Sequence, residues 1–269
     1  MKNDFVRKLS KNVGWIFEYL LSSIGKKQTM GFAGAGLVGF LLGHVGGNLQ
    51  LLNPDLAAAQ ASYNAYTKFL TGLGPTLWAI EAGLTAILLY HAGVAVKLRL
   101  ENLKAAGCRR YAVRAHKGKA SPAAFTMLCS GSIILAFLVH HVATFKFGAY
   151  YLYQDASGAI IRDMWLTTAL SFANPWIAGA YALAFLAIGA HLAHAVPSLF
   201  RTFGLVHPKW TPIFNVGGVL CAVAIFGGLS LVAVCTSWRV NTPEGKALIE
   251  QSRAAQVQLQ QIQKAEVGK

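Results

Sequence analysis

Six histidines interrupt stretches that are otherwise almost entirely apolar, and they are the residues of this chain best suited to carry chemistry. They are His44, His91, His140, His141, His191 and His194. An imidazole buried in apolar surroundings is costly unless a partner satisfies its ring nitrogens. A metal can do so, because one ring nitrogen binds the metal while the other donates a hydrogen bond.

The stretches that hold these histidines are long enough to cross a membrane. The chain has 269 residues, of which 55% are hydrophobic and 13% charged, and its mean hydropathy of +0.46 is too high for an ordinary soluble domain. A spanning helix needs about 20 apolar residues. We therefore expect an all-α bundle of five transmembrane helices, over residues 30–52, 72–96, 123–145, 172–196 and 212–238.

The two ends of the chain are expected to lie outside this 30–238 transmembrane domain. In residues 1–29 an apolar patch around Trp15 is short and broken by Glu18, which favours a short amphipathic interfacial helix over a spanning helix or a signal peptide. The polar tail, residues 239–269, begins near Thr242-Pro243-Glu244. Proline at the first helical position is typical of a helix start, so we expect a short external helix there.

Basic residues predict the orientation of the bundle. The N-terminal segment carries six Lys and Arg residues, the loop from Lys97 to Lys119 eight and the loop after Pro197 two, whereas the opposite loops carry three. Cytoplasmic loops hold the excess of such residues, which predicts a cytoplasmic N-terminus. The same bias explains most of the net charge of +14, so nucleic-acid binding is not expected.

The depths of the histidines sort them into two tiers. At about 1.5 Å per residue, His44 and His141 lie about 21 and 27 Å from the inner ends of their spans. His91 and His191 each lie about 28 Å from the outer ends of theirs. Each tier thus has one candidate ligand from each of two helices. This arrangement predicts two bis-histidine haems, and two axial imidazoles favour electron transfer over oxygen binding.

Other uses of these histidines are weighed against haem. A single intramembrane histidine can serve as a hydrogen bonder or a proton relay, but two depth-matched pairs favour ligation. Neighbouring helical positions point about 100° apart, so only one of His140 and His141 can face a given iron. His194 is expected to bind a haem propionate or to pack near the inner surface. No Cys-x-x-Cys-His motif is present, which excludes covalently attached c-type haem.

Glycines follow the first candidate ligand along its helix. Gly39, Gly43 and Gly47 recur at four-residue spacing, which suits close approach of either a flat macrocycle or a neighbouring helix backbone. The sequence leaves both open.

At this point the chain resembles the single-chain, five-helix, di-haem cytochrome b membrane anchor of succinate dehydrogenases and fumarate reductases, the b558 family. The resemblance covers roughly residues 20–240. It depends on the order and placement of GHVGGNLQLL and YNAYTKFL, YHAGVAVKLRLENLKAAGCRRYAV, HHVATFKFG, and HLAHAVPSLFRTFGL.

The resemblance implies which histidines bind iron. It matches His141 rather than His140, and His191 rather than His194. It pairs His91 with His191 at the inner haem and His44 with His141 at the outer haem, which agrees with the depths. Both groups would be non-covalent haem b.

The resemblance also implies partners in a bacterial inner membrane. These are a flavoprotein with FAD and an iron-sulfur subunit on the cytoplasmic side, lipid, and a quinone, usually menaquinone, near the outer haem. This chain has neither a G-x-G-x-x-G unit nor a cysteine cluster, so FAD and the clusters belong to the partners. The chain alone is not expected to oxidise succinate.

Further residues are assigned as weaker candidates. Glu81 is the one carboxylate within the spans and is a candidate for accepting a quinol proton, or else a protonated structural hydrogen bonder. Lys27 and Arg201 are candidates for propionate contacts at the inner haem. Some relatives have a glutamate associated with proton movement where this chain has Gly189. Arg109, Arg110 and Arg114 are candidates for partner docking, although the positive-inside bias alone also explains them.

The expected function is therefore electron transfer between an iron-sulfur subunit and menaquinone in a succinate:quinone oxidoreductase. One alternative is the cytochrome b subunit of another membrane oxidoreductase, a hydrogenase or formate dehydrogenase. Another is a membrane transporter that uses histidines as proton relays or metal ligands, which predicts no haem.

Overall fold

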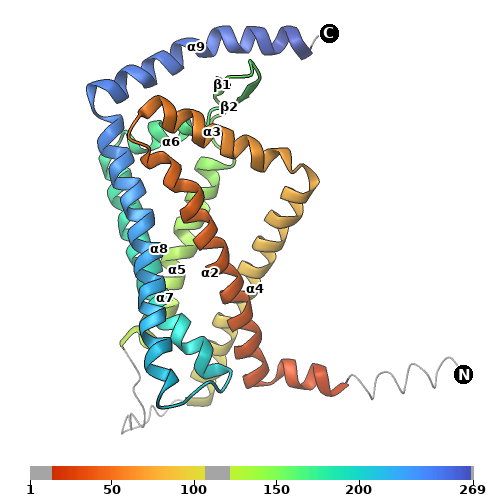
Figure 1. Ribbon diagram of the computed structural model, residues 1–269. Coiled ribbons are helices and arrows are strands. Elements are labelled where there is room, and N and C mark those ends of the chain that lie inside the picture. The colour runs from red at the N-terminus through yellow and green to blue at the C-terminus, as the bar shows by residue number, and fades with distance from the viewer. Residues whose placement is uncertain (1–13, 107–121, 268–269) are drawn as a thin grey trace, which may run out of the picture.

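Five long apolar helices dominate the computed structural model, which describes residues 14–106 and 122–267. They are α2 (Ser23–Asn48), α4 (Pro75–Ala106), α5 (Pro122–Phe145), α7 (Pro175–Thr202) and α8 (Trp210–Val240). Each contains a stretch long and apolar enough to cross a membrane. The expected all-α membrane bundle is confirmed, and the chain is a multi-pass membrane protein (Figure 1).

Three of the helices extend beyond the apolar stretches at the end of the bundle where α2 begins. α2 begins seven residues before the expected span, and α4 and α7 continue past Lys97 and Arg201. Charged residues end an apolar stretch, but they do not end a helix, because lysine and arginine are good helix formers. Their long side chains can also reach the membrane surface from within the last turns.

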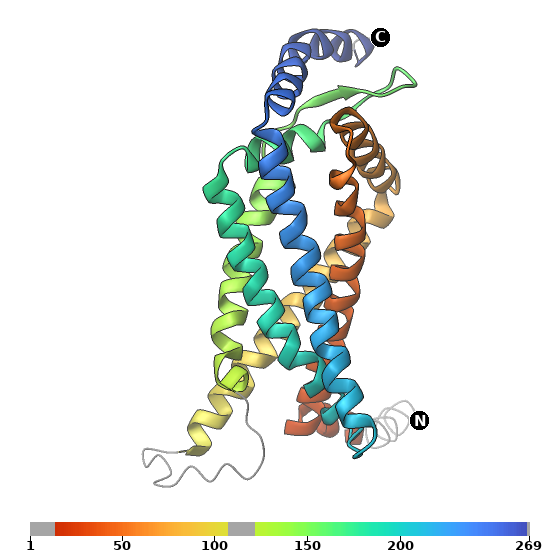
Figure 2. The ribbon, with the colours of Figure 1, turned by 60° about the vertical axis from the view of Figure 1, so that its left-hand side comes forward.

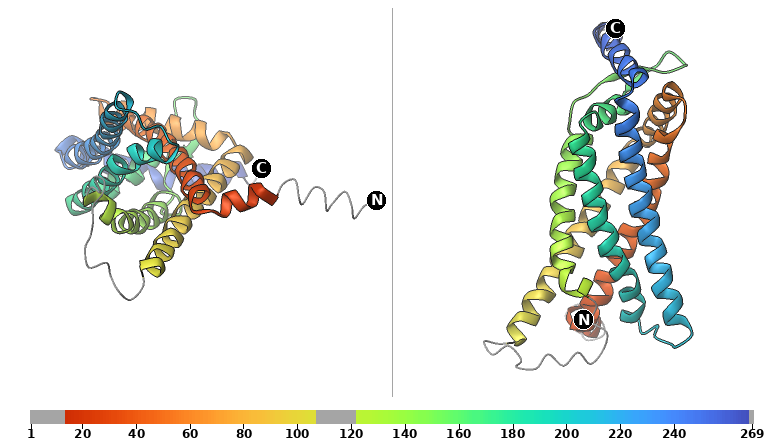
Figure 3. Two further views of the ribbon diagram at one scale, coloured as in Figure 1. Left: turned by 90° about the horizontal axis from the view of Figure 1, so that it is seen from below. Right: turned by 90° about the vertical axis from the view of Figure 1, so that its left-hand side faces the viewer.

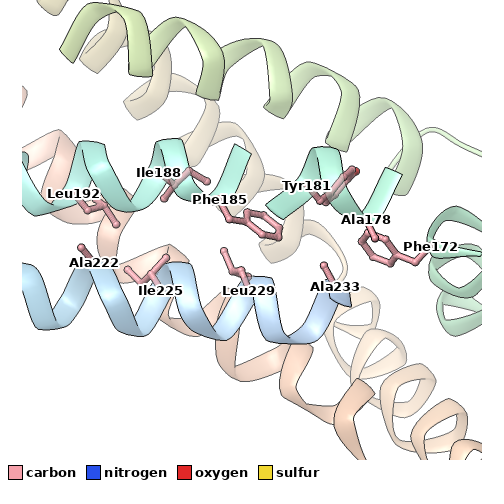
Figure 4. Packing of buried hydrophobic residues seen from close by; sticks show 10 residues of the cluster. All are labelled: Phe172, Ala178, Tyr181, Phe185, Ile188, Leu192, Ala222, Ile225, Leu229 and Ala233. Carbon is pink, nitrogen blue, oxygen red and sulfur yellow. The ribbon is translucent and has the colours of Figure 1, made fainter. Parts of the chain in front are cut away.

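The densest packing lies between α7 and α8, which run antiparallel. Their cluster of buried side chains runs along most of both helices (Figure 4). At Gly189 an added Cβ would lie 2.9 Å from Cβ of Phe226, and at Gly218 it would lie 2.6 Å from Cδ of Pro197. Glycine at these two points lets the helices approach closely. The cluster consists of Phe172, Ala178, Tyr181, Phe185, Ile188, Leu192, Ala222, Ile225, Leu229 and Ala233.

The other three long helices pack much less tightly. One third of the residues in the apolar windows of α7 and α8 are buried, whereas the share is 6% in α2 and α5 and zero in α4. α4 is tilted across the bundle and diverges from α2 toward the end where α3 lies (Figures 1 and 2). Their contacts lie toward the other end, where Tyr90 donates to Thr29 at 2.6 Å and Lys26 pairs with Glu101 at 2.7 Å.

At the end of the bundle where α2 and α4 diverge, the connections between the long helices form a folded cap. Only loops were expected there. The elements of the cap are the 3₁₀ helix η1 (Leu49–Leu52), α3 (Leu56–Gly72), the antiparallel strands β1 (Leu152–Gln154) and β2 (Ile160–Arg162), and α6 (Met164–Phe172). Asp55 and Asp163 begin α3 and α6 by accepting hydrogen bonds from the backbone amides of Ala58 and Leu166, as expected for N-cap carboxylates.

A buried polar network holds this cap together. Asp163 is 1% exposed and accepts hydrogen bonds from the side-chain amides of Asn64 and Gln60, each at 2.8 Å. The Gln60 amide also contacts the hydroxyl of Ser252, at 3.1 Å. Burial raises the pKa of Asp163, and the hydrogen bonds oppose that shift. The carboxylate therefore joins α3 to α6, and the Gln60 amide links both to the C-terminal helix.

The first and last described helices lie at opposite ends of the bundle. Residues 14–21 form the expected short helix, which turns away from the foot of α2 and carries exposed apolar side chains such as Trp15 and Leu21 (Figures 1 and 3). The tail forms α9 (Pro243–Val267). It begins where the sequence predicted, but at 25 residues it is not short, and it lies across the cap with Ile249 buried.

Candidate functional site

The histidines expected to share a tier face each other in the structure. The ring centres of His44 on α2 and His141 on α5 lie 5.8 Å apart, and those of His91 on α4 and His191 on α7 lie 6.4 Å apart. The four residues thus form two pairs, each contributed by two helices. The pairing inferred from depth along the helices is present in the structure.

Hydrogen bonds fix the ring orientation of the inner pair. Nδ1 of His91 lies 3.0 Å from the carbonyl oxygen of Met30, which can only accept, so Nδ1 carries the proton. Nδ1 of His191 lies 3.0 Å from the hydroxyl oxygen of Ser130. That hydroxyl is placed to donate to the carbonyl oxygen of Met127 at 3.1 Å, which leaves its own oxygen to accept from Nδ1 of His191. Both rings therefore keep Nε2 unprotonated, the state in which an imidazole binds a metal.

The outer pair lies among aromatic side chains. His44 stacks on Phe40 at 5.4 Å between ring centres. Phe137, Phe145 and Tyr181 lie 5.7, 5.0 and 6.1 Å from the ring of His141. Nδ1 of His141 is buried and has no hydrogen-bond partner. One ring nitrogen of His141 is therefore unsatisfied among these aromatic side chains.

The remaining two intramembrane histidines do not join these pairs. His140 is exposed, and its ring lies 6.0 Å from that of Tyr181. Nε2 of His194 lies 3.3 Å from the hydroxyl of Ser198, one turn further along α7. The preference for His141 and His191 over their neighbours thus agrees with the geometry of the pairs.

The donor set fits haem. Two imidazoles that bind one metal from opposite sides have ring centres about 6 Å apart, because each metal–nitrogen bond is about 2 Å, and both observed separations are close to this value. Haem iron needs only two ligands from the protein. Within the described residues no three His, Cys, Asp or Glu side chains are placed to hold a metal ion together, whereas zinc sites take three or four.

Glycines lie close to both rings of the inner pair. An added Cβ at Gly34 would lie 3.1 Å from the ring of His91, and one at Gly131 would lie 3.7 Å from the ring of His191. Cβ atoms at Gly39 and Gly43 would meet no atom within 4 Å, whereas one at Gly47 would lie 2.6 Å from the ring of Tyr66. Of the expected glycine ridge, Gly47 therefore serves packing against α3.

Lys27 and Arg201 come together at the inner end of the bundle. With Ile24, Ser198 and Thr202 they line an open cavity of about 320 Å³, and Arg201 also donates to the side chain of Asn215 at 2.7 Å. Two cations and two hydroxyl-bearing side chains suit a carboxylate or phosphate. Their expected role as propionate contacts stays a prediction.

Glu81 has a basic partner that the sequence analysis did not identify. Nζ of Lys146, the first residue after α5, lies 2.5 Å from the Glu81 carboxylate and 5.3 Å from the ring centre of Trp78. About a third of each charged side chain is exposed, 34% for Glu81 and 38% for Lys146. The ion pair joins α4 to the outer end of α5, on the same side of the bundle as the outer histidines.

Three side chains that lie next to the candidate residues were not predicted from the sequence, namely Ser130, Tyr181 and Lys146. Each is an isolated polar residue within or directly after an apolar stretch, and that is the one signal that points to them.

Position 189 has a physical constraint of its own, because a glutamate there would collide with Phe226 of α8. The arginines considered for docking, Arg109, Arg110 and Arg114, lie outside the described residues, as does His116.

Comparisons with known proteins give no family assignment. No family model matches the chain, and no curated protein and no solved structure matches it either.

Proposed function

We propose that this chain is the di-haem cytochrome b membrane anchor of a succinate:quinone oxidoreductase, and that it transfers electrons between an iron-sulfur subunit and menaquinone. The observation that carries the proposal is the presence of two facing histidine pairs at the two ends of one helical bundle, 5.8 and 6.4 Å apart between ring centres. Other membrane oxidoreductases also use di-haem cytochrome b subunits. The motifs quoted above resemble the b558 family and therefore favour a succinate:quinone oxidoreductase over the others.

The side chains have distinct roles in this proposal. His91 and His191 hold the inner haem, and His44 and His141 hold the outer one, each through Nε2. The haems, when bound, supply one-electron carriers with both axial positions filled. The Met30 carbonyl and the Ser130 hydroxyl accept from Nδ1 of the inner ligands, which fixes the tautomer and makes each imidazole a more basic ligand.

The location and partners follow from the same proposal. The protein lies in the bacterial inner membrane with its N-terminus in the cytoplasm. The flavoprotein, which carries FAD, and the iron-sulfur subunit bind its inner face, where Lys and Arg residues are concentrated. Succinate chemistry takes place on the flavoprotein, so this chain contributes electron transfer and a quinone site.

Visible spectra of the purified chain, oxidised and dithionite-reduced, test the haem assignment. We expect two low-spin b haems per chain. His44→Ala and His141→Ala should each remove one and the same component, and His91→Ala and His191→Ala should each remove the other. His140→Ala is the matched control and should leave both. Retention of both haem components in His44→Ala contradicts the assignment of His44 as a ligand. A purified protein without haem favours the transporter alternative.

The complex purified from membranes separates the proposed anchor from other di-haem cytochromes. Affinity purification through a tag on this chain should bring down a flavoprotein with succinate dehydrogenase activity. A nickel or molybdenum enzyme in its place assigns the chain to a hydrogenase or formate dehydrogenase instead.

Glu81 is proposed to accept a proton at the quinone site. Glu81→Gln removes the carboxylate and its ion pair with Lys146 while keeping the shape of the side chain. We expect quinone turnover to fall about 10-fold or more, as for loss of a general base, with both haems retained. Lys146→Met is the companion variant, because it removes the ion pair but keeps the carboxylate. Unchanged turnover in Glu81→Gln excludes Glu81 from the mechanism.

A further inference from the structure

The side chain of Tyr181 has a hydroxyl that its own packing does not explain. The residue is 3% exposed, and its hydroxyl is buried without a hydrogen-bond partner. Its ring packs edge-on against Phe137 and Phe172, with ring centres 4.9 and 5.1 Å away, and Figure 4 shows it on α7 close to Phe172. A phenylalanine would make the same ring contacts without burying a polar group, and an unpaired buried hydroxyl is destabilising.

A second unpaired polar atom belongs to a side chain whose ring packs near that of Tyr181. It is Nδ1 of His141, which is also buried without a partner. The two ring centres are 6.1 Å apart. A hydroxyl–nitrogen hydrogen bond of about 2.8 Å places phenol and imidazole ring centres roughly 6 to 7 Å apart. The separation of the two rings is therefore within the range for such a hydrogen bond.

The inner pair indicates what such a contact would do. There, Nδ1 of His91 and of His191 each has an acceptor, the Met30 carbonyl and the Ser130 hydroxyl. His141 lacks one, although a histidine bound to metal through Nε2 carries its proton on Nδ1 and needs an acceptor for it. His140 is about as close to Tyr181, at 6.0 Å, but among the described residues the buried atoms without a partner include Nδ1 of His141 and neither ring nitrogen of His140.

We infer that Tyr181 is a positioning residue of the outer haem site, whose hydroxyl oxygen accepts a hydrogen bond from Nδ1 of His141 when that histidine binds iron. The inference rests on the proposed di-haem function. An accepted hydrogen bond makes the imidazole a stronger electron donor, which stabilises ferric over ferrous iron. Tyr181 therefore lowers the midpoint potential of the outer haem, as Ser130 does for the inner one.

Redox titration of the full-length protein tests this inference. Tyr181→Phe should keep both haems, shift the midpoint potential of the outer haem upward and leave the inner one in place. The component missing from His44→Ala identifies the outer haem. Ser130→Ala is the reciprocal variant and should shift only the inner haem. An unmoved outer potential in Tyr181→Phe, or an equal shift of both haems, overturns the inference.

A second variant covers the possibility that Tyr181→Phe loses the outer haem. A 3-fluorotyrosine at position 181 keeps the hydroxyl and the packing but weakens the oxygen as an acceptor, so it should shift the outer potential upward by a smaller amount. No shift overturns the inference. Absence of haem from the unmodified protein overturns the proposed function itself, and the role of Tyr181 fails with it.

Discussion

Two aspartates of the cap, Asp163 and Asp155, have pKa values shifted in opposite directions. Asp163 is enclosed, and desolvation raises its pKa despite hydrogen bonds from Asn64, Gln60 and the Leu166 amide. Asp155, in the turn between β1 and β2, accepts from Nζ of Lys68 at 2.6 Å. That contact and further hydrogen bonds hold its pKa well below the usual range. Burial therefore disfavours the charged form of Asp163, whereas the contacts of Asp155 favour its charged form.

Acid should therefore release the β-hairpin. A depressed pKa means that Asp155 contributes stability above the pKa it has in the unfolded chain, about 3.9, and that this contribution is lost as the pH falls through the lower folded value. We expect the amides of Ser157 and Ala159, which donate to Asp155, to stay protected from hydrogen exchange at pH 5. They should lose protection only below about pH 4.

Lys68→Met provides the control for this pH dependence. Without the lysine, the pKa of Asp155 moves toward its ordinary value because Lys68 is the largest cause of the shift. Loss of protection should then begin at a higher pH than in the unmodified protein. Identical pH profiles for the two proteins would show that Lys68 does not stabilise the turn.

The packing of α7 against α8 depends on glycine at specific points of contact. An added Cβ at Gly189 meets Phe226 at 2.9 Å, whereas one at Gly179 of the same helix meets nothing within 4 Å. The helices are held close by a continuous buried cluster, so they cannot separate locally at low cost. A substitution at position 189 therefore acts on the whole interface.

Alanine at the two glycines should have opposite effects on stability. Gly189→Ala overpacks the interface and should destabilise the protein by about 1 to 3 kcal/mol. Gly179→Ala, the matched control, should stabilise the exposed helix face by up to about 1 kcal/mol. Thermal unfolding of the purified protein in detergent measures both. Equal midpoints would mean that α8 accommodates the added methyl group at Gly189 freely.

The bundle as a whole has two different ends, and their placement across the membrane can be measured. One end has the inner starts of α2 and α8, and the other has the cap and α9 (Figure 1). If the positive-inside bias decides orientation, the cap faces away from the cytoplasm. Val206, between α7 and α8, and Ser157, in the hairpin, are both exposed and report the two sides.

Single cysteines at these positions should react from opposite sides. In a background with the four native cysteines replaced by alanine, Ser157→Cys should react with a membrane-impermeant maleimide in intact spheroplasts. Val206→Cys should react only after permeabilisation. The reverse pattern would place the N-terminus outside and would move the proposed partner-docking face with it.

The sequence by itself determined the spans, the helical class and the two tiers of histidines. These depend on position along a helix, and a fixed rise of about 1.5 Å per residue converts residue number into depth. The ring pairs at 5.8 and 6.4 Å agree with these depths. The start of α9 at Pro243 could also be predicted from the sequence, because a helix start depends on the few residues next to it.

Only the tertiary structure decided which side chains meet across elements. The orientation of His141 rather than His140 toward His44, the Ser130 and Met30 acceptors, and the Glu81 pair with Lys146 depend on how each helix is rotated and tilted. The cap around Asp163 likewise joins residues about 100 positions apart. Periodicity along one segment carries no information about such contacts, because the packing of several helices together sets them.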